Sequence, residues 1–276
     1  MHHIDPTLEG EYNNRARVPD HPQIFERWRR DSALFRSRAN ATLDLPYGPA
    51  GRHRLDLFHA EGARGTVVFI HGGYWRSLDK SDFSFVAAPF VDAGLSVAAF
   101  NYRFCPQASL AEVVADCQQA LAWLLCHGAA HQMPLERIAL TGHSAGGHLV
   151  AMLLATDWSS LGIDARRIVG GAALSGVYNL SPLLQVSMNV GLRLDPAQAR
   201  MLSPVMLQTA VPAPLHLAVG ADDSDAFRQQ SRDLQLAWPG CVSMCETVAG
   251  CNHFTIVDYF VQPGSNAFQS VAARFD

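Results

Sequence analysis

The sequence lacks an excess of basic residues. It has 21 Lys and Arg against 25 Asp and Glu, a formal net charge of −4 at pH 7, and a single lysine, Lys80. Proteins that bind the phosphate backbone of nucleic acids usually present a basic face, and this composition cannot provide one. We therefore expect no nucleic acid partner.

Long apolar runs and export signals are also missing. No run approaches the roughly 18 apolar residues that a membrane-spanning helix requires. The N-terminal segment MHHIDPTLEGEYNN has no basic stretch followed by an apolar one, as a secretory signal would have. The six cysteines are scattered, which is typical of reduced thiols rather than of a disulfide framework. These absences predict a cytoplasmic protein with no membrane partner.

The apolar content is high enough for a large core. Hydrophobic residues make up 49% of the chain and charged residues 17%, which excludes a mainly disordered protein. No repeat or linker divides the chain, so we expect a single domain over residues 1–276. Residues 1–40 are polar and contain one helical stretch, Pro22 to Arg38, which predicts an N-terminal arm packed on the core.

Strand-like apolar runs alternate with longer amphipathic segments along the rest of the chain. This alternation predicts an α/β fold, with a mostly parallel sheet of about eight strands and helices on both faces. The expected parallel strands are Thr66–Ile70, Leu95–Asn101, Ile138–Thr141, Ile168–Leu174, Leu215–Val219 and Val242–Val248. The expected helices are Phe83–Ala93, Leu110–His127, Gly146–Thr156, Asp225–Ala237 and Phe254–Phe260. Ala41–Tyr47 and His53–Phe58 predict an antiparallel hairpin at the sheet edge.

One segment, Tyr178 to Pro212, does not fit the alternation. It separates two expected strands by far more than the usual few loop residues and is rich in Leu, Met, Pro and Ser. An insertion of this kind usually lies over an active site. We expect residues 178–212 to form a short lid, with a surface excursion as the alternative.

The strongest local signal is Gly142-His143-Ser144-Ala145-Gly146, between an expected strand and an expected helix. Small residues two places either side of a serine allow the sharp turn of a nucleophile elbow, which exposes the hydroxyl above the sheet. The helix N-terminus that follows stabilises negative charge. Ser144 is therefore the candidate nucleophile, and a structural turn serine is the alternative.

A second motif, His71-Gly72-Gly73-Tyr74-Trp75, directly follows the expected strand Thr66–Ile70. Paired glycines leave backbone N–H groups unobstructed, and together with the N–H of Ala145 they could hold an oxyanion. Gly72, Gly73 and Ala145 are thus candidates for an oxyanion hole. We expect His71 to be a structural hydrogen-bonding residue. Tyr74 and Trp75 are candidates for the substrate pocket or for the core, and His143, beside the serine, is a third pocket candidate.

A nucleophilic serine needs a base and an acid, which in this architecture follow it in the order acid, then histidine. His253 follows the expected strand Val242–Val248 and is the candidate base. Asp222, Asp223 and Asp225 follow the strand Leu215–Val219. Asp225 is expected to cap the next helix, which leaves Asp222 and Asp223 as candidate acids.

A metal site is an alternative that we considered for Cys241, Cys245, Cys251 and His253, which lie close in sequence. Their spacing lacks the paired short CxxC motifs of structural zinc sites. We therefore expect no metal and no cofactor. Asp116 is expected to form a buried pair with Arg103 rather than to belong to the site.

With these residues in hand, the chain resembles the α/β-hydrolase superfamily, and within it the kynurenine formamidase (arylformamidase) branch related to hormone-sensitive lipase. The resemblance spans roughly Tyr12 to Phe260. Its most specific parts are His71–Trp75, Gly142–Leu149, Val219–Ser231 and Asn252–Phe254. In that family the aspartate directly before the serine of the third motif is the triad acid, which selects Asp223. The Ser203-Pro204 pair also resembles the family's lid region.

The resemblance implies a serine hydrolase that cleaves a small aryl formamide or ester, similar to N-formylkynurenine, through an acyl-enzyme in tryptophan catabolism. A general carboxylesterase would use the same triad, and a non-catalytic protein that retains the fold is an alternative of another class. The expected partner is a small-molecule substrate, and a homodimer is a candidate assembly.

Overall fold

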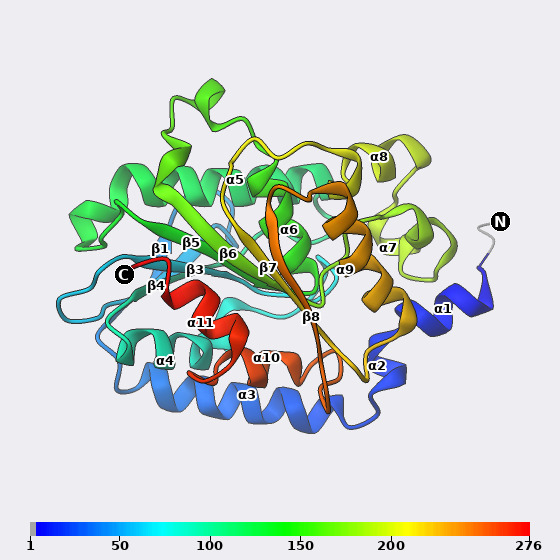
Figure 1. Cartoon of the computed structure of the whole chain (residues 1–276), viewed down its shortest axis with the longest axis horizontal. Coiled ribbons are helices and arrows are strands. Elements are labelled where there is room, and N and C mark those ends of the chain that lie inside the picture. The colour runs from blue at the N-terminus through cyan, green and yellow to red at the C-terminus, as the bar shows by residue number, and fades with distance from the viewer. Residues whose placement is uncertain (1–3) are drawn as a thin grey trace.

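A computed structural model describes residues 4–276 around an eight-stranded sheet in the order β1-β2-β4-β3-β5-β6-β7-β8 (Figure 1). β1 pairs with β2 and β2 with β4 in antiparallel fashion, and the remaining pairs are parallel. The expected edge hairpin and the mostly parallel sheet are therefore confirmed. The strands are β1 (Ala41–Pro46), β2 (Arg54–Phe58), β3 (Thr66–Ile70), β4 (Ser96–Phe100), β5 (Ile138–His143), β6 (Ile168–Leu174), β7 (Leu215–Gly220) and β8 (Val242–Val248).

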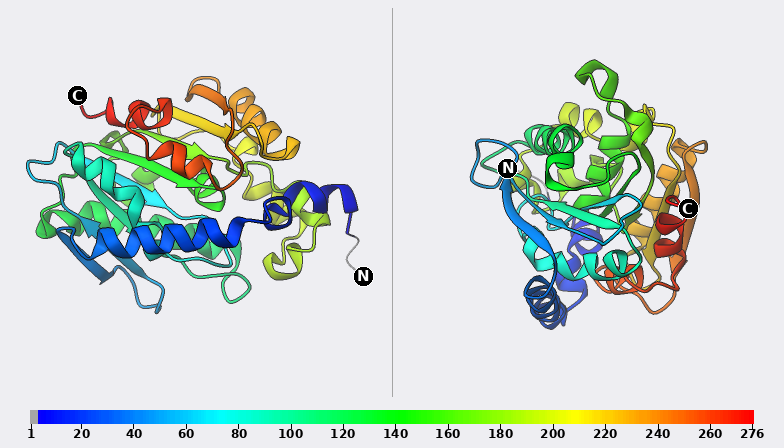
Figure 2. Two further views of the ribbon diagram at one scale, coloured as in Figure 1. Left: turned by 90° about the horizontal axis from the view of Figure 1, so that it is seen from below. Right: turned by 90° about the vertical axis from the view of Figure 1, so that its left-hand side faces the viewer.

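Helices cover both faces of the sheet, as expected (Figures 1 and 2). One face carries α5 (Leu110–His127), α6 (Ala145–Leu154) and α9 (Asp225–Ala237). The other face carries α3 (His21–Arg36), α4 (Ala87–Asp92), α10 (Ile256–Phe260) and α11 (Asn266–Ala272). A hydrophobic core lies on each face of the sheet. Alternate side chains of β3 pack into one core or the other, because successive residues of a strand point to opposite faces. Val68 and Ile70 join the first core, and Val67 and Phe69 join the second.

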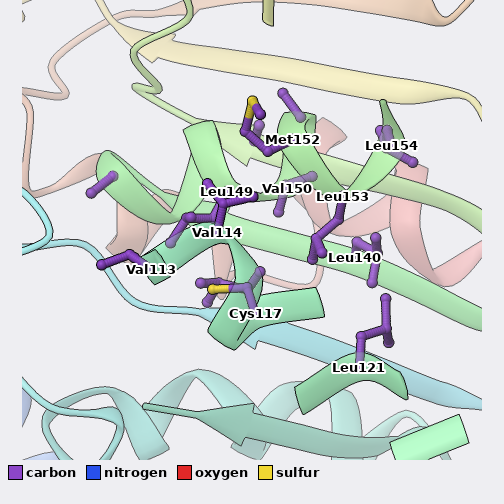
Figure 3. Close-up of a cluster of buried hydrophobic side chains, with 14 of the residues drawn as sticks. Val113, Val114, Cys117, Leu121, Leu140, Leu149, Val150, Met152, Leu153 and Leu154 are labelled. Carbon is purple, nitrogen blue, oxygen red and sulfur yellow. The ribbon is translucent and has the colours of Figure 1, made fainter. Parts of the chain in front are cut away.

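The helix α5 binds the first core through one apolar stripe. Val113, Cys117 and Leu121 recur at helical spacing and are fully buried, as the sequence pattern predicted. Figure 3 shows them beside Leu140 of β5 and Leu149 of α6. Fully burying an aliphatic side chain contributes about 1.5–3 kcal/mol, so this contact holds α5 against β5 and α6.

Several elements differ from the sequence-based expectation. The arm begins with two short helices, α1 (Pro6–Tyr12) and α2 (Asn14–Arg17), that the pattern did not predict. A 3-10 helix, η1 (Lys80–Val86), precedes α4 because Asp79 and Asp82 form a capping box there. The expectation that Asp225 caps the next helix is wrong. Ser224 is the N-cap of α9, its hydroxyl accepting the N–H of Phe227, which a serine does as well as an aspartate.

The insertion at residues 178–212 contains only short helices. It packs against α1 and α9, and Ser203 fixes it internally, since its hydroxyl accepts the N–H of Leu180 and donates to the carbonyl of Ala199. Its elements are η5 (Ser181–Gln185), α7 (Asn189–Leu192), α8 (Pro196–Met201) and η6 (Pro204–Met206). The other 3-10 turns are η2 (Gly128–His131), η3 (Trp158–Leu161) and η4 (Ala165–Arg167). Within residues 4–276, no helix has both the length and the apolar character that crossing a membrane would require.

Two ion pairs with buried members join neighbouring elements of the fold. Arg103 binds Asp116 through its backbone N–H and its guanidinium, as expected, and Asp116 is 2% exposed. The single lysine, Lys80, is also buried, with its Nζ 2.6 Å from Asp44 and 2.9 Å from Asp56. Breaking a buried pair leaves a charge without a partner and is strongly destabilising. These residues therefore have structural roles.

Three buried histidines surround the carboxyl edge of the sheet. His71 donates from Nδ1 to the carbonyl of Gly72 (2.7 Å), and His148 donates from Nε2 to that of Leu202 (2.8 Å). His143 donates from Nε2 to the carbonyl of His253 (2.7 Å). Burial lowers the pKa of His71 and of His148 to about 4 and that of His143 to about 3, because the charged imidazole would lose its hydration. All three rings are neutral at pH 7.

These histidines predict acid sensitivity. Below an ordinary histidine pKa of 6.5, the unfolded chain takes up protons at these rings and the folded chain does not. The stability present above that pH should therefore be lost as the pH falls toward 4, by up to about 1.4 kcal/mol per pH unit for each histidine. The free energy of unfolding can be measured by urea denaturation at pH 7, 6 and 5. Its dependence on pH should be less steep in His148→Gln, by about one proton, because one titrating ring is removed while glutamine can still donate to Leu202. His127→Gln, at an exposed position, should leave this dependence unchanged. Equal slopes in wild type and His148→Gln would contradict the assignment.

Candidate active site

Ser144 lies in a strained turn between β5 and α6. Its backbone has φ 54° and ψ −116°, a combination that L-residues rarely adopt. Its N–H donates to Leu174 and its carbonyl accepts from His148, so the surrounding backbone maintains the strain. Such strained residues gather at functional sites, and this geometry matches the nucleophile elbow that the motif predicts.

The glycines of the motif are required by close packing. A Cβ at Gly146 would lie 1.9 Å from the carbonyl oxygen of Ile70, and one at Gly142 would lie 2.4 Å from that of Gly146. Either side chain would push α6 away from β3 and β5. The small residues two places before and after Ser144 therefore allow strand and helix to meet at this turn.

His253 and Asp223 complete a hydrogen-bonded chain with Ser144. The Oγ of Ser144 is 3.0 Å from Nε2 of His253, and Nδ1 of His253 is 2.9 Å from Oδ2 of Asp223. The serine hydroxyl donates to the imidazole, which donates to the carboxylate. All three residues are at most 4% exposed. Asn252 holds the loop of the histidine, its Oδ1 accepting the N–H groups of Phe254 and Thr255.

The structure distinguishes between the neighbouring aspartates. Asp223 is buried and its second oxygen accepts the N–H of Ser224 (2.9 Å). Asp222 is exposed, and Asp225 is exposed at the first turn of α9, where it pairs with Arg228. Only Asp223 of the three contacts the imidazole of His253 within the described residues.

A glycine turn and a helix N-terminus lie beside Ser144. Gly72 packs against it so closely that a Cβ would lie 3.2 Å from the Cβ of Ser144. Gly73 has φ 108°, which glycine adopts without strain. In the part of the chain that the structure describes, the N–H groups of Gly72, Gly73 and Ala145 donate no hydrogen bond. Unpaired N–H groups at a helix N-terminus and at a glycine turn are suited to an oxyanion.

A cavity of about 250 Å³ opens beside Ser144 and His253. Tyr74 lines it, as expected, and its hydroxyl donates to the carbonyl of Tyr12. His143 also lines it, but its ring holds the carbonyl of His253 and so positions the base loop. The assignment of Trp75 to the pocket is wrong. Its side chain is fully buried with its ring against His148, because the chain turns at Tyr74 and Trp75 with positive φ and directs Trp75 into the core.

Sequence reasoning missed the contribution of the N-terminal arm. The arm was expected only to pack on the core, yet much of the cavity wall comes from it. The lining residues from the arm are Tyr12, Asn13, Asn14, Arg15, Phe25 and Trp28. The insertion at residues 178–212 contributes Met188. Aromatic spacing in α3 was visible in the sequence, but no local pattern shows which site a helix face will meet.

The cysteines near His253 are not arranged around it. Cys241 donates to the carbonyl of Ala213, and Cys245 lies on β8. Within residues 4–276 no three His, Cys, Asp or Glu side chains are placed to hold a metal ion. His253 instead joins Ser144 and Asp223. The arrangement has the parts for acyl transfer: a nucleophile, a base, an orienting acid and oxyanion donors.

Comparison with known proteins places this geometry in a family. A family model described as BD-FAE matches residues 55–167. A kynurenine formamidase from Danio rerio is 31% identical over 239 residues, which covers 82% of this chain and 79% of the fish protein.

Solved structures agree on the fold. A thioesterase candidate from Silicibacter sp. TM1040 has a TM-score of 0.87 and 33% identity, with 96% of this chain and 98% of that chain covered. An esterase from the bacterial hormone-sensitive lipase family has a TM-score of 0.65 at 20% identity, with 94% and 96% covered, which shows the fold alone. With its eight-stranded sheet, this chain is an enzyme of the hydrolase class and belongs to the kynurenine formamidase family of the α/β-hydrolases.

Proposed function

We propose that the protein is a serine hydrolase that cleaves an aryl formamide similar to N-formylkynurenine. The observation that carries this proposal is the Ser144-His253-Asp223 chain at the base of a cavity with aromatic walls. The kynurenine formamidase from Danio rerio supports the choice of a formamide.

The geometry is suited to attack by Ser144. As Oγ of Ser144 bonds to the formyl carbon, its proton passes to Nε2 of His253, 3.0 Å away. The N–H groups of Gly72, Gly73 and Ala145 hold the oxyanion, each donor being typically worth about 3 kcal/mol. His253 then returns the proton to the aryl nitrogen, the C–N bond breaks and the amine leaves. Water then loses a proton to His253 and attacks the formyl-serine, the C–O bond to Ser144 breaks, and His253 returns the proton to Oγ as formate leaves.

Asp223 orients the base in this scheme. By accepting the Nδ1–H of His253, it leaves Nε2 unprotonated toward Ser144, and it stabilises the imidazolium that forms. His143 holds the backbone of His253 from the other side. The base is therefore fixed at both its ring and its carbonyl.

The cavity accommodates an aromatic leaving group. Phe25, Trp28 and Phe254 form one wall with their rings in mutual contact, at centroid distances from 5.0 to 6.4 Å. Aromatic side chains bind another ring through stacked or edge-to-face contacts. The aryl ring of the substrate packs on this wall while the formyl group faces Ser144.

A general carboxylesterase is the second candidate function. The same triad cleaves esters, and the relative from Silicibacter sp. TM1040, described as a thioesterase candidate, is 33% identical. The two functions differ in the leaving group and in how well the cavity binds it.

Substrate comparison tests the proposal directly. We expect efficient turnover of N-formylkynurenine, with kcat/KM above that for 4-nitrophenyl acetate. Ser144→Ala should lower both activities by at least about 10⁴-fold, because the nucleophile is lost. Turnover of the ester alone, abolished in Ser144→Ala, would make the enzyme a carboxylesterase.

The role of Asp223 predicts a large loss on a nearly isosteric change. Asp223→Asn should lower kcat by about 10³–10⁴-fold, because the amide favours the wrong imidazole tautomer. The neighbouring Asp222→Asn, at an exposed residue, is the matched control and should retain activity. The measurement is kcat of both variants from steady-state kinetics. Equal kcat values for the two variants would exclude Asp223 as the triad acid.

A further inference from the structure

Two arginines without a carboxylate partner lie at the cavity that holds Ser144. Arg15 belongs to α2 and Arg76 to the loop after β3, and both are exposed. Arg15 donates from Nη2 to Oγ of Ser77 (3.1 Å), and Arg76 donates from Nη1 to the carbonyl of Met188 (3.2 Å). Since Ser77 directly follows Arg76, both arginines lie beside the same loop at the cavity.

The charge of this wall is uncompensated. Among the described residues that line the cavity there is no aspartate or glutamate. Nearby arginines of the arm differ in this respect: Arg17 lies 3.8 Å from Glu11, and Arg27 lies 2.6 Å from Asp258. Arg15 and Arg76 form no such pair within residues 4–276. A guanidinium matches a carboxylate with two parallel hydrogen bonds, so this wall favours an anionic ligand.

An independent observation at the same wall also points to a ligand. Asn14, which precedes Arg15 and lines the cavity, is 4% exposed. Its amide lies beside the hydroxyl of Tyr74, and neither its nitrogen nor its oxygen reaches full hydrogen-bond geometry in the described part of the chain. Buried polar groups are normally fully hydrogen-bonded, so this amide can take a further polar partner from a substrate in the cavity.

The arm that carries these residues is firmly attached. The carboxylate of Glu9 accepts the N–H and the hydroxyl of Ser187, and the carboxylate of Glu11 accepts the N–H of Ala226. Gln230 of α9 donates to the hydroxyl of Tyr12. Asn14 and Arg15 are therefore held in place beside the cavity.

We propose that Arg15 and Arg76 bind a carboxylate of the substrate, with Asn14 taking a second polar atom of the same substituent. The enzyme then prefers anionic aryl substrates of the amino-acid type over neutral ones. This inference rests on the proposed function in one respect only, that the cavity beside Ser144 is the substrate site.

Matched acid and carboxamide substrates test the proposal. One pair is N-formylkynurenine and its carboxamide, and the other is O-acetyltyrosine and its carboxamide, so each pair shares one reacting bond and differs in one charge. We expect wild type to favour each acid by about tenfold or more in kcat/KM, since a hydrogen bond to a charged group contributes about 1.5–3 kcal/mol. Arg15→Gln and Arg76→Gln should each reduce this ratio about tenfold, and added salt should reduce it in wild type.

Arg17→Gln is the matched control, since Arg17 lies on the same helix but outside the cavity lining. Its acid-to-carboxamide ratio should equal that of wild type. A wild-type ratio near one, or the same ratio in Arg15→Gln and Arg76→Gln as in wild type, would overturn the inference. If wild type cleaves the esters but neither formamide, the proposed function fails, and the ester pair still decides the role of the arginines.

Discussion

The close contact between α6 and β3 is the constraint on which the site depends. Gly146 lies so near the carbonyl of Ile70 that no Cβ can be accommodated. This contact forces the chain to turn sharply after β5 and holds Ser144 at positive φ. The same turn directs the N-terminus of α6, with the N–H of Ala145, toward the serine. One backbone contact therefore determines the positions of both the Ser144 hydroxyl and the N–H of Ala145.

Neutral buried histidines extend this framework. His143 is adjacent to the nucleophile and holds the carbonyl of His253, while His148 joins α6 to the insertion through Leu202. His71 stacks on Tyr102 at a centroid distance of 4.5 Å beneath the Gly72-Gly73 turn. Each ring gives one directed hydrogen bond to a carbonyl and is otherwise packed. Their pKa values are lowered because the same packing that orients them removes water.

The N-terminal arm contributes much of the cavity wall beside Ser144. Its long helix α3 packs along one face of the molecule (Figure 2) and supplies Phe25 and Trp28 to the aromatic wall. Its two short helices bring Asn14 and Arg15 to the same cavity. The triad and its turn are formed by the sheet and its loops, whereas the chemistry of the wall comes largely from a segment outside the sheet. In the proposed function, the reaction type therefore depends on the sheet and its loops, and the substrate choice on the arm.

The sequence by itself determined the features that depend on local spacing. Apolar runs identified the strands, and the glycines around Ser144 identified the turn, because only glycine permits such close backbone contact. The order of Ser144, the aspartates and His253 followed from the same strand ends. The family resemblance selected Asp223 over Asp222, and the tertiary structure shows its contact with His253. Only the tertiary structure showed that Trp75 packs in the core and that the arm lines the cavity. These outcomes bring together residues far apart in the sequence, such as Asn14 and His253, which line the same cavity. No local pattern specifies such contacts, since they arise when separate elements pack on a common sheet.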